Sequence, residues 1–411
     1  MEPTIGDLIY DWNSLKKRGP LTTKRIEFDD ETLRDGIQSP SVADPATEDK
    51  LEILHLQARL GITTSDIGLP GAGPRAREDV TRLAKEIVSQ KLPIKANCAA
   101  RTVVQDIQPI VEVSQETGLP IEVYTFIGSS PIRQYAENWD VDHIAATMEK
   151  AISFAVKEGM DVAFVTEDTT RSRPDHLDRL FRHAINLGCK RLVICDTVGH
   201  STPDGIFNLI SWVQGLINGT GADVKIDWHG HNDRGLAVTN AIHAIEAGAD
   251  RIHGTCLGIG ERVGNAALDQ VLMNLKLLGA IDNDLTALVA YCRTVSRACR
   301  WPIPKNYPLA GEDAFRTATG VHASAIVKAL ERNDRDLADR VYSGVPAHWF
   351  GKEQEIEIGP MSGMSNVRYW LSNRRFPVTE DLSKAILNKA KASNRTLEEA
   401  EVLEIVRQHS V

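Results

Sequence analysis

Residues 223–256 read DVKIDWHGHNDRGLAVTNAIHAIEAGADRIHGTC, and this stretch contains the pattern that decides the fold. A run with valine and isoleucine at alternate positions is followed by a helical run that ends at Gly248, and a second apolar run then begins at Arg251. Glycine just past the last turn is typical of a helix C-terminus, because it adopts the left-handed conformation without steric cost. The stretch therefore predicts a strand, a helix and a second, parallel strand.

The same unit recurs on both sides of this stretch. Short apolar runs return at a spacing of roughly 26–40 residues, with helical patterns between them. The runs are RIEFDD (25–30), TSDIGL (64–69), PIKANC (93–98), IEVYTFIG (121–128), DVAFVT (161–166), RLVICD (191–196), DVKIDWHG (223–230) and RIHGTC (251–256). Eight strand–helix units predict an α/β fold of the (β/α)8 TIM-barrel class, with its site at the C-terminal ends of the strands. A doubly wound sheet is the alternative, and it would place the site at the same strand ends.

Composition limits the kinds of partner. The chain has 411 residues, with 47 basic and 56 acidic side chains and a formal net charge of −9. This balance argues against nucleic acid and against an anionic membrane surface, both of which need a basic face. The first residues lack a basic head followed by an apolar run, and no apolar run reaches about 18 residues. Six scattered cysteines without a Cys-x-x-Cys pair indicate reduced thiols, so we expect a cytoplasmic protein.

The strand–helix pattern stops near residue 285. The proline-rich segment WPIPKNYPLAG (301–311) has no period and indicates a linker. Helical patterns follow it: ASAIVKALERN (323–333), DLSKAILNKAKASN (381–394) and TLEEAEVLEIVRQH (396–409). We expect a barrel domain over residues 1–285 that includes a short N-terminal extension. We expect a linker and helical subdomain over 286–411, and no C-terminal regulatory domain.

Two histidines mark a candidate metal site. His229 and His231 are two residues apart at the end of a predicted strand, so their side chains point to the same face. Asp35, just past the first strand, could add a carboxylate. Nitrogen and oxygen ligands without cysteine suit Mg²⁺, Mn²⁺, Co²⁺ or Zn²⁺, and the same ligand set could hold Fe²⁺. The alternative is that these polar side chains only hydrogen-bond the loop.

Other polar residues follow the strands. Arg34 could hold a carboxylate or an oxyanion, or it could pair with an acidic neighbour. Glu167 stands beside a second carboxylate, and such neighbours in a cleft acquire separated pKa values that suit acid–base work. Thr197 could hydrogen-bond a small carboxylate. His322 begins a helix beyond the barrel, where a lone histidine is typical of a cap or a packing residue.

Taken together and in order, the motifs resemble the DRE-TIM metallolyase superfamily. Within it they are similar to the Claisen-type 2-alkylmalate synthases, a group with 2-isopropylmalate, homocitrate and citramalate synthases. The resemblance spans about residues 24–370 and rests on ETLRDGIQ (31–38), DIGLP (66–70), TEDTTR (166–171), DTVG (196–199), HGHND (229–233), GIGERVGN (258–265), GEDAF (311–315), TGVH (319–322) and PMSG (360–363).

The resemblance implies a role for each matching residue. Asp35, His229 and His231 match the ligands of a divalent metal, Mg²⁺ or Mn²⁺ first and Zn²⁺ or Co²⁺ as alternatives. Asn265 and Glu261 match a loop that closes near the metal, and Asn265 is counted with the metal group.

The remaining matches concern the two substrates. Arg34 and Thr197 match residues that contact the 2-oxo acid. Glu167 and His322 match the pair that takes a proton from the methyl group of acetyl-CoA, and Tyr342 matches a tyrosine near that histidine. We expect Gln38 and Glu261 to contact substrate as well. The expected wall of the 2-oxo acid pocket consists of Asp66, Leu69, Asn97, Tyr124 and Ser129.

Two residues depart from the family pattern. Ile37 replaces an acidic residue, and Asp66 stands where glutamate is usual. Both are expected near the 2-oxo acid pocket, so 2-oxoisovalerate, 2-oxoglutarate, pyruvate and a specialised oxo acid remain open as substrates. An apolar residue at position 37 is also similar to hydroxymethylglutaryl-CoA lyases. Those lyases use a cysteine in a Gly-Gly-Cys loop, a context that Cys256 lacks.

The resemblance therefore implies a metal-dependent acyltransferase that condenses acetyl-CoA with a 2-oxo acid, with 2-isopropylmalate synthase as the first expectation. The alternatives are a homocitrate, citramalate or specialised alkylmalate synthase, a carbon–carbon lyase, and a metabolite sensor without turnover. His322 and Tyr342 lie outside the eight-strand pattern. We therefore expect a homodimer in which one chain completes the site of the other.

Overall fold

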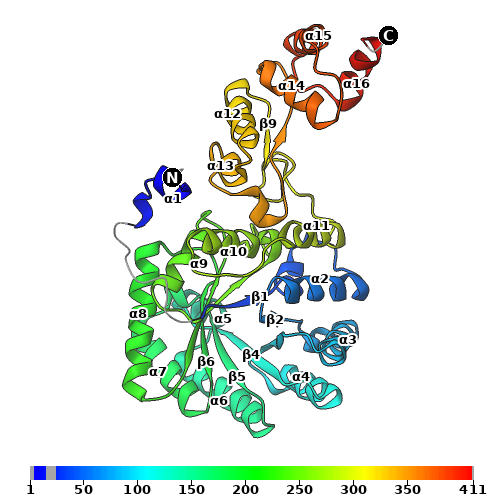
Figure 1. Cartoon of the computed structure of the whole chain (residues 1–411). Helices are drawn as coiled ribbons and strands as arrows, with labels where there is room; N and C mark the ends of the chain where they lie inside the picture. Colours follow the sequence, from blue (N-terminus) through cyan, green and yellow to red (C-terminus); the bar gives the residue numbers. More distant parts are fainter. Residues whose placement is uncertain (1–3, 15–24, 410–411) are drawn as a thin grey trace. The chain divides into compact units, whose positions relative to one another are not determined.

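The computed structural model describes residues 4–14 and 25–409. The described residues form two compact units. One unit consists of residues 25–302, and the other consists of residues 4–14 together with 303–409. Figure 1 shows both units and labels most of their helices and strands.

The first unit is a closed barrel of eight parallel strands in chain order, and β8 pairs with β1 to close it. The strands are β1 (Glu27–Asp30), β2 (Thr64–Asp66), β3 (Lys95–Arg101), β4 (Ile121–Gly128), β5 (Val162–Glu167), β6 (Arg191–Asp196), β7 (Lys225–Gly230) and β8 (Arg251–Gly254). Each coincides with one of the eight apolar runs. The TIM-barrel prediction is confirmed, and closure excludes the doubly wound sheet.

Helices surround the strands (Figure 1). They are α2 (Thr47–Arg59), α3 (Pro74–Gln90), α4 (Val104–Thr117), α5 (Pro131–Glu137), α6 (Val141–Lys157), α7 (Pro174–Asn186), α8 (Pro203–Thr220), α9 (Ala237–Glu246), α10 (Leu268–Leu277) and α11 (Leu288–Ala298). Gly188 and Gly248 follow α7 and α9 with φ of +102° and +105°, as the cap pattern predicted.

Helix α11 belongs to the barrel unit. Arg297 on α11 lies 2.6 Å from the carboxylate of Glu52 on α2, and the hydroxyl of Tyr291 hydrogen-bonds Asp30 at the end of β1. These contacts carry the barrel unit through residue 302, beyond the boundary that loss of the strand–helix pattern suggested.

Charged side chains fill the barrel interior beneath the strand ends. Arg191 donates to Asp227 at 2.6 Å and to Glu27 at 2.5 Å. Arg251, which is 1% exposed, donates to Glu27 and to Glu122, both at 3.0 Å. Charges as deeply buried as these are tolerated because each has partners of opposite sign. These ion-paired side chains form a layer beneath the candidate site, which we call the ionic layer.

The second unit is mostly helical. Its elements are α1 (Ile5–Leu8), β9 (Arg316–Thr317), α12 (Gly320–Glu331), α13 (Arg335–Arg340), β10 (Glu355–Ile356), α14 (Met364–Asn373), α15 (Glu380–Lys391) and α16 (Glu399–Gln408). The three predicted helical stretches are confirmed. The short parallel pair β9–β10 was not predicted. The rest of the predicted N-terminal extension lies outside the described residues. Among the helices of residues 4–14 and 25–409, none has the length and apolar content to cross a membrane.

Candidate metal and substrate site

A cavity of about 220 Å³ lies at the C-terminal ends of the barrel strands. It brings together residues that lie on or just after seven of the eight barrel strands, from Glu31 after β1 to Arg262 after β8. The sequence-predicted residues in its lining are Arg34, Asp35, Gln38, Tyr124, Glu167, Thr197, His229, His231 and Glu261.

Asp35, His229 and His231 converge on one point of this cavity. The Nε2 atoms of the two histidines are 3.2 Å apart, and Oδ2 of Asp35 lies 3.6 Å from each of them. All three residues are buried, and Oδ2 of Asp35 has no hydrogen-bond partner among the described residues. A buried carboxylate oxygen without a donor is costly unless a cation binds it. The three atoms fit a divalent cation.

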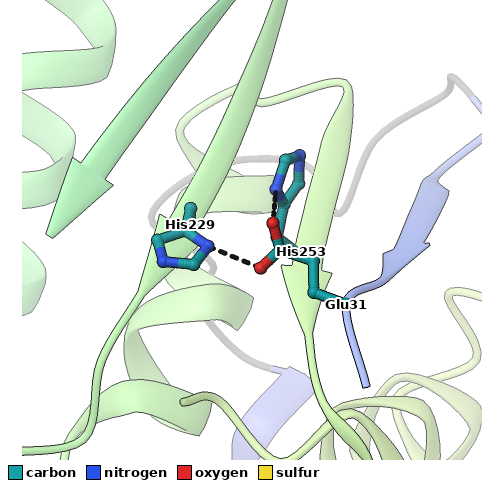
Figure 2. A group of neighbouring side chains, drawn as sticks. All are labelled: Glu31, His229 and His253. Atoms are coloured by element: carbon teal, nitrogen blue, oxygen red, sulfur yellow. Dashed lines mark hydrogen bonds and ion pairs between the residues drawn. The ribbon is translucent and has the colours of Figure 1, made fainter. Parts of the chain in front are cut away.

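Glu31 determines which nitrogen of His229 faces the metal position. Its Oε2 lies 2.6 Å from Nδ1 of His229 (Figure 2). The Nδ1–H group therefore donates a hydrogen bond to the carboxylate, and the Nε2 lone pair points toward His231 and Asp35. Nε2 of His231 lies 3.2 Å from this lone pair, so both nitrogens can bind the same cation. Burial alone would raise the pKa of Glu31, but His229, Arg34 and His253 hold it well below its usual range.

His253 was not predicted as a site residue, yet it lines the cavity. Its Nδ1 lies 3.1 Å from Oε1 of Glu31, as Figure 2 shows, and its Nε2 lies 3.2 Å from Asp227. Burial would lower the pKa of His253, but the carboxylates of Glu31, Asp227 and Asp29 raise it to about 10. A cationic His253 thus holds Glu31 from the side opposite His229. The sequence did contain a signal for this residue. Side chains alternate between the two faces of a strand, so His253 points into the barrel from β8 as Arg251 does.

Asn265 lies in the loop after β8, beside the metal group formed by Asp35, His229 and His231. It forms an isolated bridge with His231, and its Nδ2 donates to the carbonyl oxygen of Ile259 at 3.2 Å. Its Oδ1 is buried and has no hydrogen-bond partner in the described part of the chain. This amide oxygen is therefore available as a ligand.

Arg34 is held by three carboxylates. Its nitrogens lie 2.7 Å from Asp66, 2.8 Å from Glu31 and 3.2 Å from Asp35. Asp66 does not line the cavity. It lies behind Arg34, and its carboxylate orients the guanidinium group. Burial raises the pKa of Asp66 to about 6, against the opposing effect of Arg34.

Glu167 and Thr197 stand on the opposite side of the cavity. Glu167 ends β5, and its carboxylate lies 3.7 Å from Arg133. Burial raises the pKa of Glu167, although Arg133 and Arg34 oppose the shift. The hydroxyl of Thr197 accepts a hydrogen bond from the backbone of Asp168 at 2.8 Å. Glu167 therefore combines cavity access with an environment that favours proton uptake.

Several residues expected in the pocket lie elsewhere. Asn97 donates to both oxygens of Asp29 beneath the cavity, at 2.8 and 3.0 Å. The hydroxyl of Ser129 forms a hydrogen bond with the hydroxyl of Ser172, with 2.8 Å between the two oxygens. Leu69 and Ile37 line a neighbouring cavity of about 520 Å³, which shares Arg34 and Gln38 with the first. The departure from the family pattern at position 37 therefore faces that second cavity.

His322 and Tyr342 belong to the second unit. Their rings stack with centroids 4.0 Å apart and an interplanar angle of 28°. Tyr342 is 48% exposed. His322 and the tyrosine that was expected near it are thus in contact.

The chain is similar to known proteins in sequence and in fold. A family model described as HMGL-like matches residues 25–295. Homocitrate synthase AksA of Methanopyrus kandleri is 31% identical over 366 residues, which are 88% of this chain and 86% of that protein. The 2-isopropylmalate synthase of Pyrococcus furiosus is 30% identical over 374 residues, which are 90% of this chain and 72% of that protein. The HMG-CoA lyase of Brucella melitensis has a similar structure, with a TM-score of 0.56, 17% identity, and coverage of 67% of this chain and 99% of that one. This last likeness concerns the fold alone.

Proposed function

Because the chain belongs to the HMGL-like family and, within it, to the 2-alkylmalate synthases, we propose that it condenses acetyl-CoA with a 2-oxo acid and releases CoA. The first expected product is 2-isopropylmalate, formed from 2-oxoisovalerate. The observation that carries the proposal is the convergence of Asp35, His229 and His231 in a cavity that Arg34 and Glu167 also line.

The proposed cofactor is Mg²⁺ or Mn²⁺, with Zn²⁺ or Co²⁺ as alternatives. Asp35, His229 and His231 would hold it, and the free Oδ1 of Asn265 supports a fourth ligand from the protein. A divalent cation bound there supplies Lewis-acid polarisation of the 2-oxo acid's carbonyl group.

The chain's own residues would carry the remaining steps. Glu167 or His322 takes a proton from the methyl carbon of acetyl-CoA, and that carbon forms a bond with the carbonyl carbon of the 2-oxo acid. Arg34 stabilises the negative charge that develops on the carbonyl oxygen, which then takes up a proton. Thr197 hydrogen-bonds the substrate carboxylate. Water cleaves the thioester, which yields the new carboxylate and the free thiol of CoA.

Assembly and location complete the proposal. His322 and Tyr342 lie in the second unit, and the metal group lies in the barrel unit. We propose a homodimer in which the second unit of one chain serves the barrel of the other. All six cysteines are buried and form no disulfide bond, which favours a cytoplasmic location.

A thiol-release assay tests the proposed function. Purified protein with Mg²⁺ or Mn²⁺ is incubated with acetyl-CoA and, in turn, 2-oxoisovalerate, pyruvate, 2-oxobutyrate and 2-oxoglutarate. CoA release that requires a 2-oxo acid supports the synthase. Release of acetyl-CoA from a 3-hydroxyacyl-CoA, without synthase activity, would instead identify a carbon–carbon lyase. Substrate binding without either reaction would identify a sensor.

A further inference from the structure

The cavity has two chemically different halves. The polar half, built on β1, β7 and β8, presents Glu31, Arg34, Asp35, His229, His231 and His253. The other half, built on β3 to β6, presents Ala99, Tyr124, Phe126, Val165, Val193 and Cys195, and at its outer edge Glu167, which ends β5, and Thr197, which follows β6. The reacting carbonyl and carboxylate groups of a 2-oxo acid match the polar half together with Thr197 at the edge of the second half, so the rest of the substrate would face the apolar side chains of the second half.

Below Glu167 and Thr197, the side chains of this second half are mostly apolar. Tyr124, Val193 and Cys195 form one buried cluster, and Val165 packs against it. The hydroxyl of Tyr124 donates to Asp227 at 2.9 Å, in the ionic layer beneath the site. The thiol of Cys195 is neutral, because burial raises its pKa well above the usual range. An uncharged substrate side chain gains from contact with such a wall.

Cations near the cavity are already neutralised. Arg34 has three carboxylates within 3.2 Å, and His253 has two within 3.2 Å. Arg262, the remaining cation of the lining, is paired with Asp233 at 2.9 Å. A second carboxylate on the substrate would therefore be buried against the apolar half without a counter-charge, which is strongly unfavourable.

We infer that this chain selects a 2-oxo acid with a short, uncharged, apolar side chain, and that Val165 and Val193 limit the length of that side chain. Both valines present methyl groups to the cavity from neighbouring strands, β5 and β6. The inference rests on the proposed function and adds to it the discrimination against dicarboxylic 2-oxo acids.

The experiment compares kcat/KM values for the full-length enzyme. We expect 2-oxoisovalerate to exceed 2-oxoglutarate by about 10²-fold or more, and to exceed pyruvate, which lacks the branched side chain, by about 10-fold or more. Val165→Ala and Val193→Ala should each raise the ratio of 4-methyl-2-oxovalerate to 2-oxoisovalerate by about 10-fold. The ratio does not depend on the fraction of folded protein, so partial destabilisation of a variant does not obscure the result.

Val162→Ala is the matched control. Val162 lies on β5 like Val165 and is 1% exposed, but it does not line the cavity. Its truncation removes the same atoms and should leave the substrate ratio unchanged. Equal or better use of 2-oxoglutarate by the wild type would overturn the inference while the proposed function stands. Unchanged ratios in both cavity variants would do the same. CoA release with no 2-oxo acid at all would instead count against the proposed function.

Discussion

Oε2 of Glu31 lies 2.6 Å from Nδ1 of His229, so a buried carboxylate orients one of the candidate metal ligands. The other oxygen of Glu31 is held by His253 at 3.1 Å. The ligand His229 is therefore anchored through Glu31 and His253 to Asp227 in the ionic layer of the barrel, and these contacts preorient it for a metal ion.

The first prediction concerns Glu31. Glu31→Gln removes the charge that keeps His229 in one tautomer and orientation, so the affinity for Mn²⁺ should fall by about 10- to 100-fold. Titration of the chelator-treated protein with Mn²⁺, followed calorimetrically, measures the change. Glu52→Gln, at the barrel surface, should bind Mn²⁺ like the wild type. Wild-type affinity in Glu31→Gln would show that this contact does not support the ligand.

The second prediction concerns the metal group itself. Chelation should abolish CoA release, and Mg²⁺ or Mn²⁺ should restore it. The double variant His229→Ala, His231→Ala should neither bind Mn²⁺ measurably nor recover activity, because it loses two of the three converging ligands. Full activity of that variant without metal would refute the assignment.

The third prediction concerns pH and stability. The pKa of His253 is about 10 in the folded chain, against an ordinary value of 6.5. The fold therefore favours the protonated imidazole. Its contribution to the free energy of unfolding is complete below about pH 6.5 and is lost as the pH rises through about 10. His253→Gln should therefore lose less of its free energy of unfolding as the pH rises.

Urea denaturation of the metal-free protein at about pH 7 and about pH 10 measures that decline. The free energy of unfolding should differ less between the two pH values in His253→Gln than in the wild type. The control is His55→Gln, a histidine that pairs with Glu86 at the surface. The free energy of unfolding of this variant should fall between the two pH values by as much as that of the wild type. An identical decline in His253→Gln would contradict the assigned protonation.

The fourth prediction concerns the second unit. His322→Ala should retain Mn²⁺ and 2-oxo acid binding, because those ligands lie in the barrel unit. Turnover should fall by about 10²- to 10⁴-fold, the usual effect of removing a positioned acid–base group. Weakened Mn²⁺ binding in this variant would show a structural role instead.

Assembly in trans has a separate test. Inactive Arg34→Ala and His322→Ala chains, mixed under conditions of subunit exchange, should regain activity, because a mixed dimer contains one site with both residues intact. If the subunits demonstrably exchange and no activity returns, each site is built within one chain.

The sequence predicted the barrel well because its signal is local. Each strand is a short apolar run, and glycines such as Gly188 and Gly248 end the helices between them. It also predicted that His229, His231 and Asp35 would meet, since the C-terminal ends of all barrel strands share one rim.

The sequence did not reveal the supports of that group. His253 meets Glu31 only because β8 pairs with β1 to close the barrel, a pairing that no local pattern encodes. Asn97 was expected in the pocket, but its strand position places it one layer lower, against Asp29. Which inward residue reaches the cavity depends on the stagger between strands, and that stagger is a property of the closed barrel.

The most direct test of the central claim follows the acetyl carbon. The protein is incubated with Mg²⁺, [2-¹³C]acetyl-CoA and 2-oxoisovalerate, and the products are examined by NMR. The account predicts that the label appears in the methylene carbon of 2-isopropylmalate, in an amount equal to the CoA released. Label found only in acetate or in unreacted acetyl-CoA, with 2-oxoisovalerate and with every other 2-oxo acid of the panel, would contradict it.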